Sequence, residues 1–195
     1  MKSRIDFATN KTITGTTNAG ALVNADINNL AFTFDGKEYR LGKFTSKEFC
    51  ENTGFFFDVE DYIKSRTSYS DELESLILKD KEGQIVSLTI ENVTDFSEDI
   101  LTYPVYGINY DCGCELEDGA EVHDMTIYGV KIGDSGEDVV TIWGEPDGDD
   151  RYEYEGGGGA SYFLGEGITS VAVFVDYADE YGVFHLGICK NTESK

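Results

Sequence analysis

Apolar and polar residues alternate with a period of two along much of the chain, as they do in half-buried β-strands. The alternation is clearest at Val171, Val173 and Val175, which are separated by single residues. Short turn sequences join many of these segments, which indicates antiparallel pairing. Strands are predicted over residues 31–34, 37–41, 73–78, 84–91, 100–110, 150–155, 160–164, 168–177 and 182–189.

A first short helix is predicted from its end signals. Thr45 and Glu48 fit a capping box, in which the Thr side chain accepts from the Glu48 amide and the Glu side chain reaches back. Gly54 is predicted to end the helix as its C-cap. The helix is therefore expected over about residues 46–53.

A second helix of similar length is predicted in the other half of the chain. Asp134 and Ser135 are both suitable N-caps, and Gly144 with the following Pro146 closes the helix. A helix this short needs a sheet against its apolar face. The predicted apolar face consists of Val139, Ile142 and Trp143.

The two helices belong to a pattern that occurs twice. Leu41-Gly42 and Ile132-Gly133 each precede a capped helix, and they are 91 residues apart (132 minus 41). We therefore predict an α+β fold with two related units, each a short helix packed on antiparallel strands. The predicted divisions are a polar N-terminal tether (1–29), a first unit (30–111), an acidic connecting segment (112–126) and a second unit (127–195).

Composition narrows the classes of partner. The chain has 195 residues and a net charge of -23, a field that repels nucleic acid and anionic membrane surfaces. With 12 Phe and 12 Tyr it is too aromatic for a disordered acidic tail. No apolar run is long enough for a membrane span. The tether is rich in Thr, Asn, Ala and Gly, so we expect an extracytoplasmic protein anchored at the cell surface through a segment outside this sequence.

The cysteines allow a zinc site as an alternative. Cys112, Cys114 and His123 could supply thiolates and an imidazole, but the second pair of ligands that structural zinc sites use is missing, and Cys50 or Cys189 would have to complete the set. An ordinary connecting loop is the preferred interpretation. Reduced, partly buried thiols are the default, and the disulfide status stays open.

One short segment resembles a hydrolase motif. Gly133-Asp134-Ser135-Gly136 is the tetrapeptide around the nucleophile of chymotrypsin-like proteases. A hydrolytic Ser needs a His base, and His123, upstream of it, lacks the motif of that family. Helix capping explains Ser135 instead. The sequence thus assigns no catalytic, cofactor-binding or metal-binding residue, and we expect no enzyme activity. The alternative of a hydrolase of unrecognised type would require His123 or His185 to lie in a cleft beside an activated nucleophile.

Two acidic clusters permit a calcium-stabilised alternative. Residues 147–150 begin like an ion-binding loop, but Arg151 stands where an EF-hand needs an oxygen ligand. The second cluster lacks motif spacing. Solvated turns are the preferred interpretation of both. The second cluster comprises Glu115, Glu117, Asp118, Glu121 and Asp124.

Several aromatic residues on predicted strands could line a binding face, although such residues more often pack in a core or across strands. They are Tyr152, Tyr154, Tyr162 and Phe174. The nearby run Gly156 to Gly159 lacks the Lys and Ser or Thr of a phosphate loop. It is predicted to form a flexible hairpin tip.

Residues 128–147, with Gly133, Val139, Gly144 and Pro146 at their fixed spacing, resemble the repeat unit of β-lactamase-inhibitory-protein-like domains. Similar units occur in small outer-membrane-assembly lipoproteins, and the whole chain resembles Gram-positive surface lipoproteins of unassigned function. The first unit matches loosely, with Phe55 and Phe56 where the second has Glu145 and Pro146. The resemblance implies a binding module whose partner is another protein or a cell-surface component.

Overall fold

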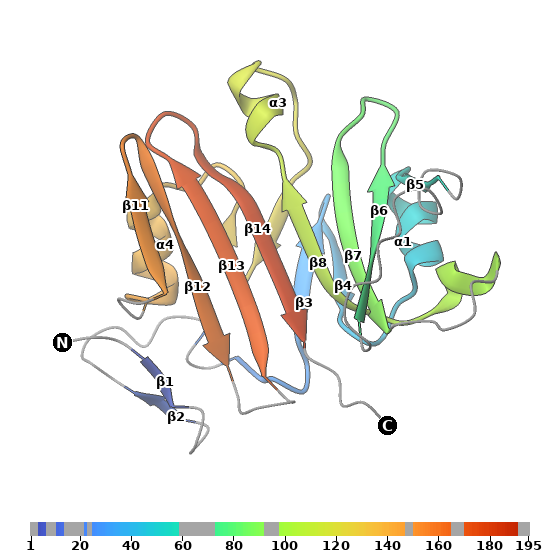
Figure 1. Ribbon diagram of the computed structural model, residues 1–195, viewed down its shortest axis with the longest axis horizontal. Coiled ribbons are helices and arrows are strands. Elements are labelled where there is room, and N and C mark those ends of the chain that lie inside the picture. Colours follow the sequence, from blue (N-terminus) through green and yellow to red (C-terminus); the bar gives the residue numbers. More distant parts are fainter. Residues whose placement is uncertain are drawn as a thin grey trace.

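The computed structural model describes residues 4–6, 11–13, 22, 25–58, 73–91, 98–146, 150–164 and 170–190. In these residues the chain has an α+β fold, as predicted, with antiparallel sheets and short helices (Figure 1). Strands β1 (Arg4–Asp6) and β2 (Lys11–Ile13) form a two-stranded sheet of their own. No described helix is long and apolar enough to cross a membrane.

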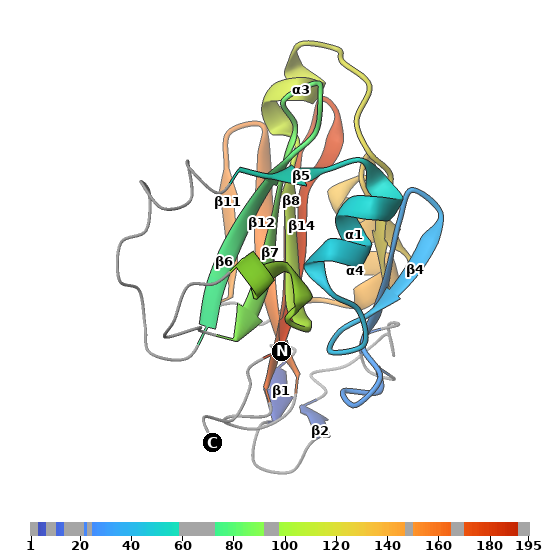
Figure 2. The same cartoon turned by 90° about the vertical axis from the view of Figure 1, so that its right-hand side faces the viewer.

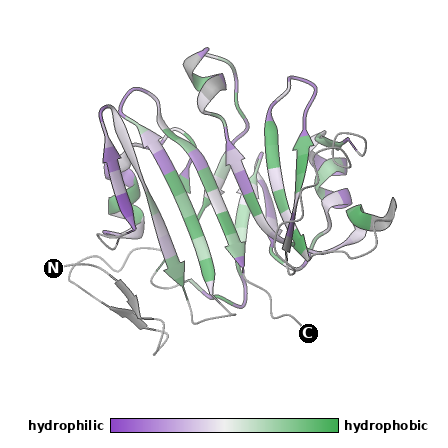
Figure 3. Cartoon of the chain, in the orientation of Figure 1, coloured by the Kyte–Doolittle hydropathy of each residue, from purple (hydrophilic) through white to green (hydrophobic). Residues whose placement is uncertain are grey.

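The largest sheet has eight strands in the order β11-β12-β13-β14-β8-β7-β6-β5, and every neighbouring pair is antiparallel. Its strands are β5 (Phe56–Phe57), β6 (Leu73–Lys79), β7 (Ile85–Glu91), β8 (Val105–Asp111), β11 (Arg151–Tyr154), β12 (Gly157–Leu164), β13 (Val171–Ala178) and β14 (Gly182–Lys190). Figure 3 shows hydrophobic residues along β13 and β14 and hydrophilic residues on the edge strand β11.

A smaller sheet has the order β10-β9-β3-β4. Its strands are β3 (Ala31–Phe34), β4 (Lys37–Arg40), β9 (Met125–Ile127) and β10 (Val130–Lys131). The β3–β4 turn is the predicted Asp35-Gly36 pair, and both residues have positive φ, 49° and 76°. This is the backbone that two-residue hairpins favour.

Both predicted helices are present. Helix α1 (Ser46–Thr53) has Thr45 as N-cap in a complete capping box, and Gly54 ends it in the left-handed conformation. Helix α4 (Gly136–Trp143) has Ser135 as N-cap. Asp134, the other predicted cap, instead accepts a hydrogen bond from the Lys131 amide. Shorter helices are α3 (Gly113–Glu117) and the 3-10 helix η2 (Glu98–Thr102).

The elements form layers. Helices α1 and α4 and the small sheet lie on one side of the large sheet (Figure 2), and the core fills the space between them. The viewer of Figure 1 looks onto the opposite side. We call this side the open face; it carries Tyr152, Tyr154, Phe174, Asp176 and His185.

Aromatic residues dominate the core under α1. The ring centroid of Phe34 lies 5.2 Å from that of Phe49 and 5.5 Å from that of Tyr110. Under α4, Trp143 meets Tyr162 edge-on at 5.3 Å. Tyr162 is buried there, and so it does not line the open face.

In the described residues of 31–111 and of 125–190, a hairpin is followed by a helix and then by four strands, and the first range also contains η2. The halves are joined in both sheets, because β14 pairs with β8 and β9 pairs with β3. In each half, the four strands that follow the helix pair in sequence order, and each of these pairs is antiparallel. The interpretation as two related units stays a prediction, but the two halves share both the large and the small sheet.

Some predicted boundaries were wrong. The strand predicted over 100–110 begins only at Val105, because η2 occupies its start and Pro104 has no amide hydrogen for a ladder. Met125, in the predicted connecting segment, already begins β9. In the predicted tether, Leu22 is buried and Ile27 packs against the core, so the folded body begins before residue 30.

Candidate functional site

The edge of the open face is built from tyrosines that lie over glycines. Strand β11 pairs with β12 so that Tyr154 stands opposite Gly157 and Tyr152 opposite Gly159. The turn between the strands is Glu155-Gly156, and the remaining glycines belong to β12. The prediction of a flexible hairpin tip over 156–159 is therefore wrong for Gly157 to Gly159, which are strand residues, whereas Gly156 does lie in the hairpin turn.

Glycine is required in this strand because the tyrosines occupy the space of its missing side chains. A Cβ atom at Gly157 would lie 2.8 Å from the Tyr154 Oη atom, and one at Gly159 would overlap the Tyr152 hydroxyl. On the other face of the sheet, a Cβ atom at Gly158 would lie 2.9 Å from Oη of Tyr177. Each glycine thus accommodates a tyrosine ring that crosses its strand.

Tyr152 and Tyr154, which we call the tyrosine pair, are half-exposed yet held in place. They are 50% and 47% exposed, and their ring centroids are 6.3 Å apart with an interplanar angle of 23°. The Tyr152 hydroxyl donates to Asp176, and the Tyr154 hydroxyl donates to the carbonyl oxygen of Tyr177 at 3.2 Å. Partial burial and the neighbouring Asp176 carboxylate raise the pKa of Tyr152, so its hydroxyl stays protonated.

A polar row continues from the tyrosine pair across the open face. Tyr152, Gly159, Asp176 and His185 are cross-strand partners in four adjacent strands. Asp176 contacts Nδ1 of His185 at 2.5 Å, and Nε2 of the same ring contacts Oδ1 of Asn109. Burial opposes ionisation of Asp176, but hydrogen bonds from His185 and Tyr152 lower the pKa of Asp176 below its usual value. This row of hydrogen bonds holds the Tyr152 side chain in place on the open face.

An open pocket of about 560 Å³ lies at the end of the large sheet beside the tyrosine pair. The β11–β12 turn, the β13–β14 turn and the start of α3 surround it. Aromatic side chains and carboxylates line it together. The aromatic lining residues are Tyr154, Tyr181 and Phe184, and the acidic ones are Asp111, Glu155, Asp179 and Glu180.

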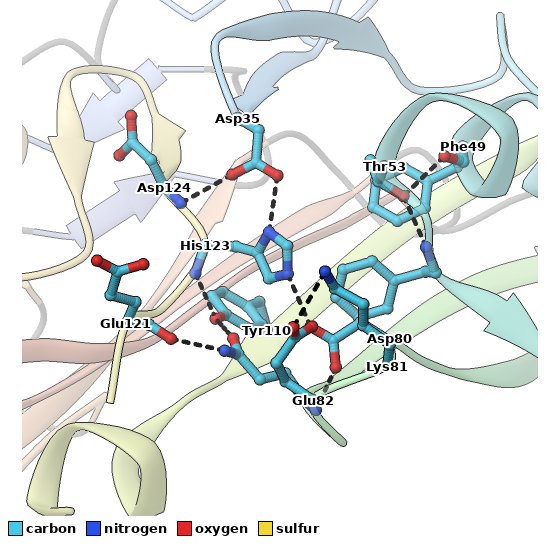
Figure 4. Close-up of polar contacts among 12 residues, drawn as sticks. Asp35, Phe49, Thr53, Asp80, Lys81, Glu82, Tyr110, Glu121, His123 and Asp124 are labelled. Atoms are coloured by element: carbon cyan, nitrogen blue, oxygen red, sulfur yellow. Dashed lines mark hydrogen bonds and ion pairs between the residues drawn. The ribbon is translucent and has the colours of Figure 1, made fainter. Parts of the chain in front are cut away.

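A second polar cluster surrounds His123 inside the fold (Figure 4). Nδ1 of its ring lies 2.7 Å from Oδ2 of Asp35, and Nε2 lies 3.1 Å from Oδ2 of Asp80. Ionised carboxylates only accept hydrogen bonds, so both contacts form when the ring carries two protons. Burial opposes ionisation of Asp80, but hydrogen bonds from His123 and from the Gln84 amide lower the pKa of Asp80.

Tyr110 completes this cluster from strand β8. Its hydroxyl accepts from the His123 amide at 2.9 Å and donates to Oε1 of Gln84 at 2.6 Å, and the Gln84 side chain donates to the Glu121 carbonyl oxygen. The cluster therefore fastens the connecting segment to the turn after β3 and to the turn between β6 and β7. This arrangement is a structural link.

The residues considered for a hydrolase or a zinc site make structural contacts instead. Ser135 accepts from the Asp138 amide and donates to its carboxylate, as a helix cap does. Cys112 is buried and donates to the Phe184 carbonyl oxygen, and burial raises the pKa of its thiol to about 12. Burial likewise raises the pKa of Cys50 to about 11. Cys50, Cys112 and Cys189 are free thiols, whereas the side chain of Cys114 is outside the described part.

Most of the first candidate calcium loop cannot be compared with the structure, because residues 147–149 lie outside the described ranges. Arg151, which follows them, pairs with Glu145 and Glu153. In the described part of the chain, no three His, Cys, Asp or Glu side chains are grouped so as to hold a metal ion. Phe174 is half-buried on the open face, next to the polar row.

Sequence reasoning considered Tyr152 and Tyr154 for a binding face, and His185 only as a residue of the hydrolase alternative, but it missed Asp176 and Asn109. A signal for the tyrosine–glycine contacts was present. Tyrosines two residues apart, a short turn, and glycines two residues apart are brought opposite each other when the hairpin closes. No such local signal links Asn109 to His185, because they are 76 residues apart.

Comparison of the chain with family models, with curated proteins and with solved structures finds no match in any of the three.

Proposed function

We propose that this chain is a binding protein that recognises another protein or a cell-surface component through the open face around the tyrosine pair, and that it catalyses no reaction. The observation that carries the proposal is the rigid presentation of two half-exposed aromatic rings on a glycine strand. Tyrosine side chains in such positions are typical centres of protein interfaces.

The anchoring of the tyrosine pair favours binding for a physical reason. A side chain that orders when a partner arrives loses about 0.5–1.5 kcal/mol of conformational freedom. Hydrogen bonds to Asp176 and to the Tyr177 carbonyl oxygen already fix the two rings. The rings therefore offer apolar area to a partner at low entropic cost.

The state of the histidines supports a role without catalysis. A hydrolytic serine needs a ring nitrogen within hydrogen-bond reach to take its proton. Both ring nitrogens of His123 contact aspartates, and those of His185 contact Asp176 and Asn109. Ser135 bonds to Asp138. The raised thiol pKa of Cys50 and Cys112 also disfavours a thiolate nucleophile.

An extracytoplasmic, surface-anchored location is part of this proposal. Its support is the resemblance of residues 128–147 to repeat units of binding proteins and lipoproteins, together with the polar composition near the N-terminal side. Protease added to intact producing cells should degrade the protein while a cytoplasmic marker survives. Survival of both would place the protein inside the cell and contradict this part.

Site-directed crosslinking tests the binding surface. A photoreactive phenylalanine analogue placed at Tyr154 should form adducts in producing cells that the same analogue at Glu51 does not form. Glu51 is an exposed residue of α1, on the other side of the large sheet. Each partner recovered in this way is then purified and its affinity for the chain is measured.

The affinity measurement decides the proposal. Tyr152→Ser combined with Tyr154→Ser should weaken binding of that partner by at least about tenfold, because interface aromatics contribute about 2 kcal/mol or more. The control Lys47→Ser with Glu51→Ser changes two exposed residues without changing net charge and should bind normally. Equal adducts at both positions, or normal binding by the tyrosine variant, would show that the surface is misassigned.

A further inference from the structure

The pocket beside the tyrosine pair combines ring faces with negative charge. Tyr154, Tyr181 and Phe184 form its aromatic part, and the last two rings meet edge-on with centroids 5.8 Å apart. They belong to β11, the β13–β14 turn and β14, which hydrogen-bonded strands hold in register. Three elements of the large sheet therefore each contribute one aromatic side chain to the lining of this pocket.

Every lining side chain that carries a charge at pH 7 is acidic: Asp111, Glu155, Asp179 and Glu180. All four are exposed to water at the rim. Their combined field adds to that of a chain with a net charge of -23. Aromatic faces attract cations through the ring quadrupole, and carboxylates pair with them. The pocket therefore complements a cation that also has flat or apolar surface.

We propose that this pocket receives the side chain of an arginine or lysine from a basic segment of the partner protein, an inference that rests on the proposed function. Arginine suits it best, because its planar guanidinium stacks on aromatic rings while its five N–H groups reach carboxylates at the rim. The partner is therefore expected to carry a positive charge where it contacts this end of the large sheet.

The position of the pocket favours a protein segment over a small free cation. Tyr154 belongs both to the pocket and to the tyrosine pair, so the two surfaces are continuous. A volume of about 560 Å³ also exceeds what one guanidinium group fills, which leaves room for the chain that carries it. A bound segment would lie along the β11 edge and cover Tyr152 as well.

Fluorescence anisotropy with labelled hexa-arginine tests the inference, with hexa-glutamate and a Gly-Ser hexapeptide as reference probes. The titration is run at 0.15 M salt, where charges more than about 8 Å apart are screened. Hexa-arginine should bind the unaltered chain, and the reference probes should not. Asp179→Asn with Glu180→Gln, both exposed turn residues, should weaken hexa-arginine by about tenfold.

A charge-matched variant separates pocket binding from general attraction to an acidic protein. Glu51→Gln with Glu82→Gln also removes two exposed carboxylates, but away from the pocket, and should weaken binding less than about threefold. Equal weakening by both variants would overturn the inference. Absence of saturable hexa-arginine binding below about 1 mM would overturn it too.

Tyr152→Ser distinguishes this inference from the proposed function. Tyr152 is outside the pocket lining, so hexa-arginine should still bind this variant, whereas the purified partner should bind it weakly. Loss of the partner without any hexa-arginine binding to the unaltered chain would leave the binding surface valid and the cation pocket wrong. Normal binding of the partner to Tyr152→Ser and to Tyr154→Ser would contradict both.

Discussion

Replacing His123 by alanine should destabilise the protein by about 3 kcal/mol, because this side chain fastens segments that are distant in sequence. Its contact with Asp35 contributes little: Asp35 is 40% exposed, and such pairs contribute about 0.5 kcal/mol. Asp80 is only 6% exposed and would lose its contact with Nε2 of His123. The Gln84 amide still donates to Asp80 at 2.7 Å, so this loss is about 2 kcal/mol.

Packing adds the remainder. The imidazole ring lies 4.9 Å from the Phe55 ring and 5.3 Å from the Phe34 ring, measured between centroids, and removing it costs about 0.5 kcal/mol. Urea unfolding at pH 7, followed by the fluorescence of the buried Trp143, measures the change. For a chain of this size the melting temperature should fall by about 6 to 12 °C.

Two further variants examine the reasoning. Adding Asp80→Asn to His123→Ala should recover about 1 kcal/mol, since a neutral amide is less costly to bury than a carboxylate that has lost one of its hydrogen-bond partners. Lys81→Ala, in the same turn but 86% exposed, should stay within about 0.5 kcal/mol of the unaltered chain. A loss below about 1 kcal/mol for His123→Ala, or no recovery in the double variant, would refute the argument.

Other predictions concern acid, a cap and a glycine. Burial opposes ionisation of Asp80 and Asp176, but their hydrogen bonds lower both pKa values, so the stability they contribute is complete above about pH 5 and is lost as pH falls through the folded pKa. The urea midpoint should drop over that range, and less so in Asp80→Asn with Asp176→Asn. Ser135→Ala should lose about 1 kcal/mol in urea unfolding. Gly157→Ala should lose about 2 kcal/mol by thermal unfolding, because its Cβ overlaps the backbone oxygen of Tyr177.

Features encoded within a few residues could be predicted from the sequence. The capping box of Thr45 and Glu48 and the Asp35-Gly36 turn each lie within a span of four residues or fewer, and the structure has both as expected. Val171, Val173 and Val175 alternate because one face of β13 meets the core, and all three are buried. Local patterns of this kind record the environment of each residue directly.

Features that depend on distant pairing could not be predicted. His123 meets Asp35 across 88 residues and Asp80 across 43, and no spacing rule connects such positions. The run Gly157 to Gly159 was misinterpreted for a different reason. In a sequence alone, a run of glycines is typical of a mobile turn. Only the register with β11 shows that tyrosine rings lie over these glycines.

The place of β14 has a consequence for how the chain is made. Although β14 is the last described strand, it lies in the interior of the large sheet, between β13 and β8. During synthesis from the N-terminus, β8 and β13 are therefore complete before the strand that joins them exists. Each then presents an unpaired row of amide and carbonyl groups to which strands of other nascent copies can add. Crowded polysomes are consequently the condition in which this fold is most exposed to misassembly.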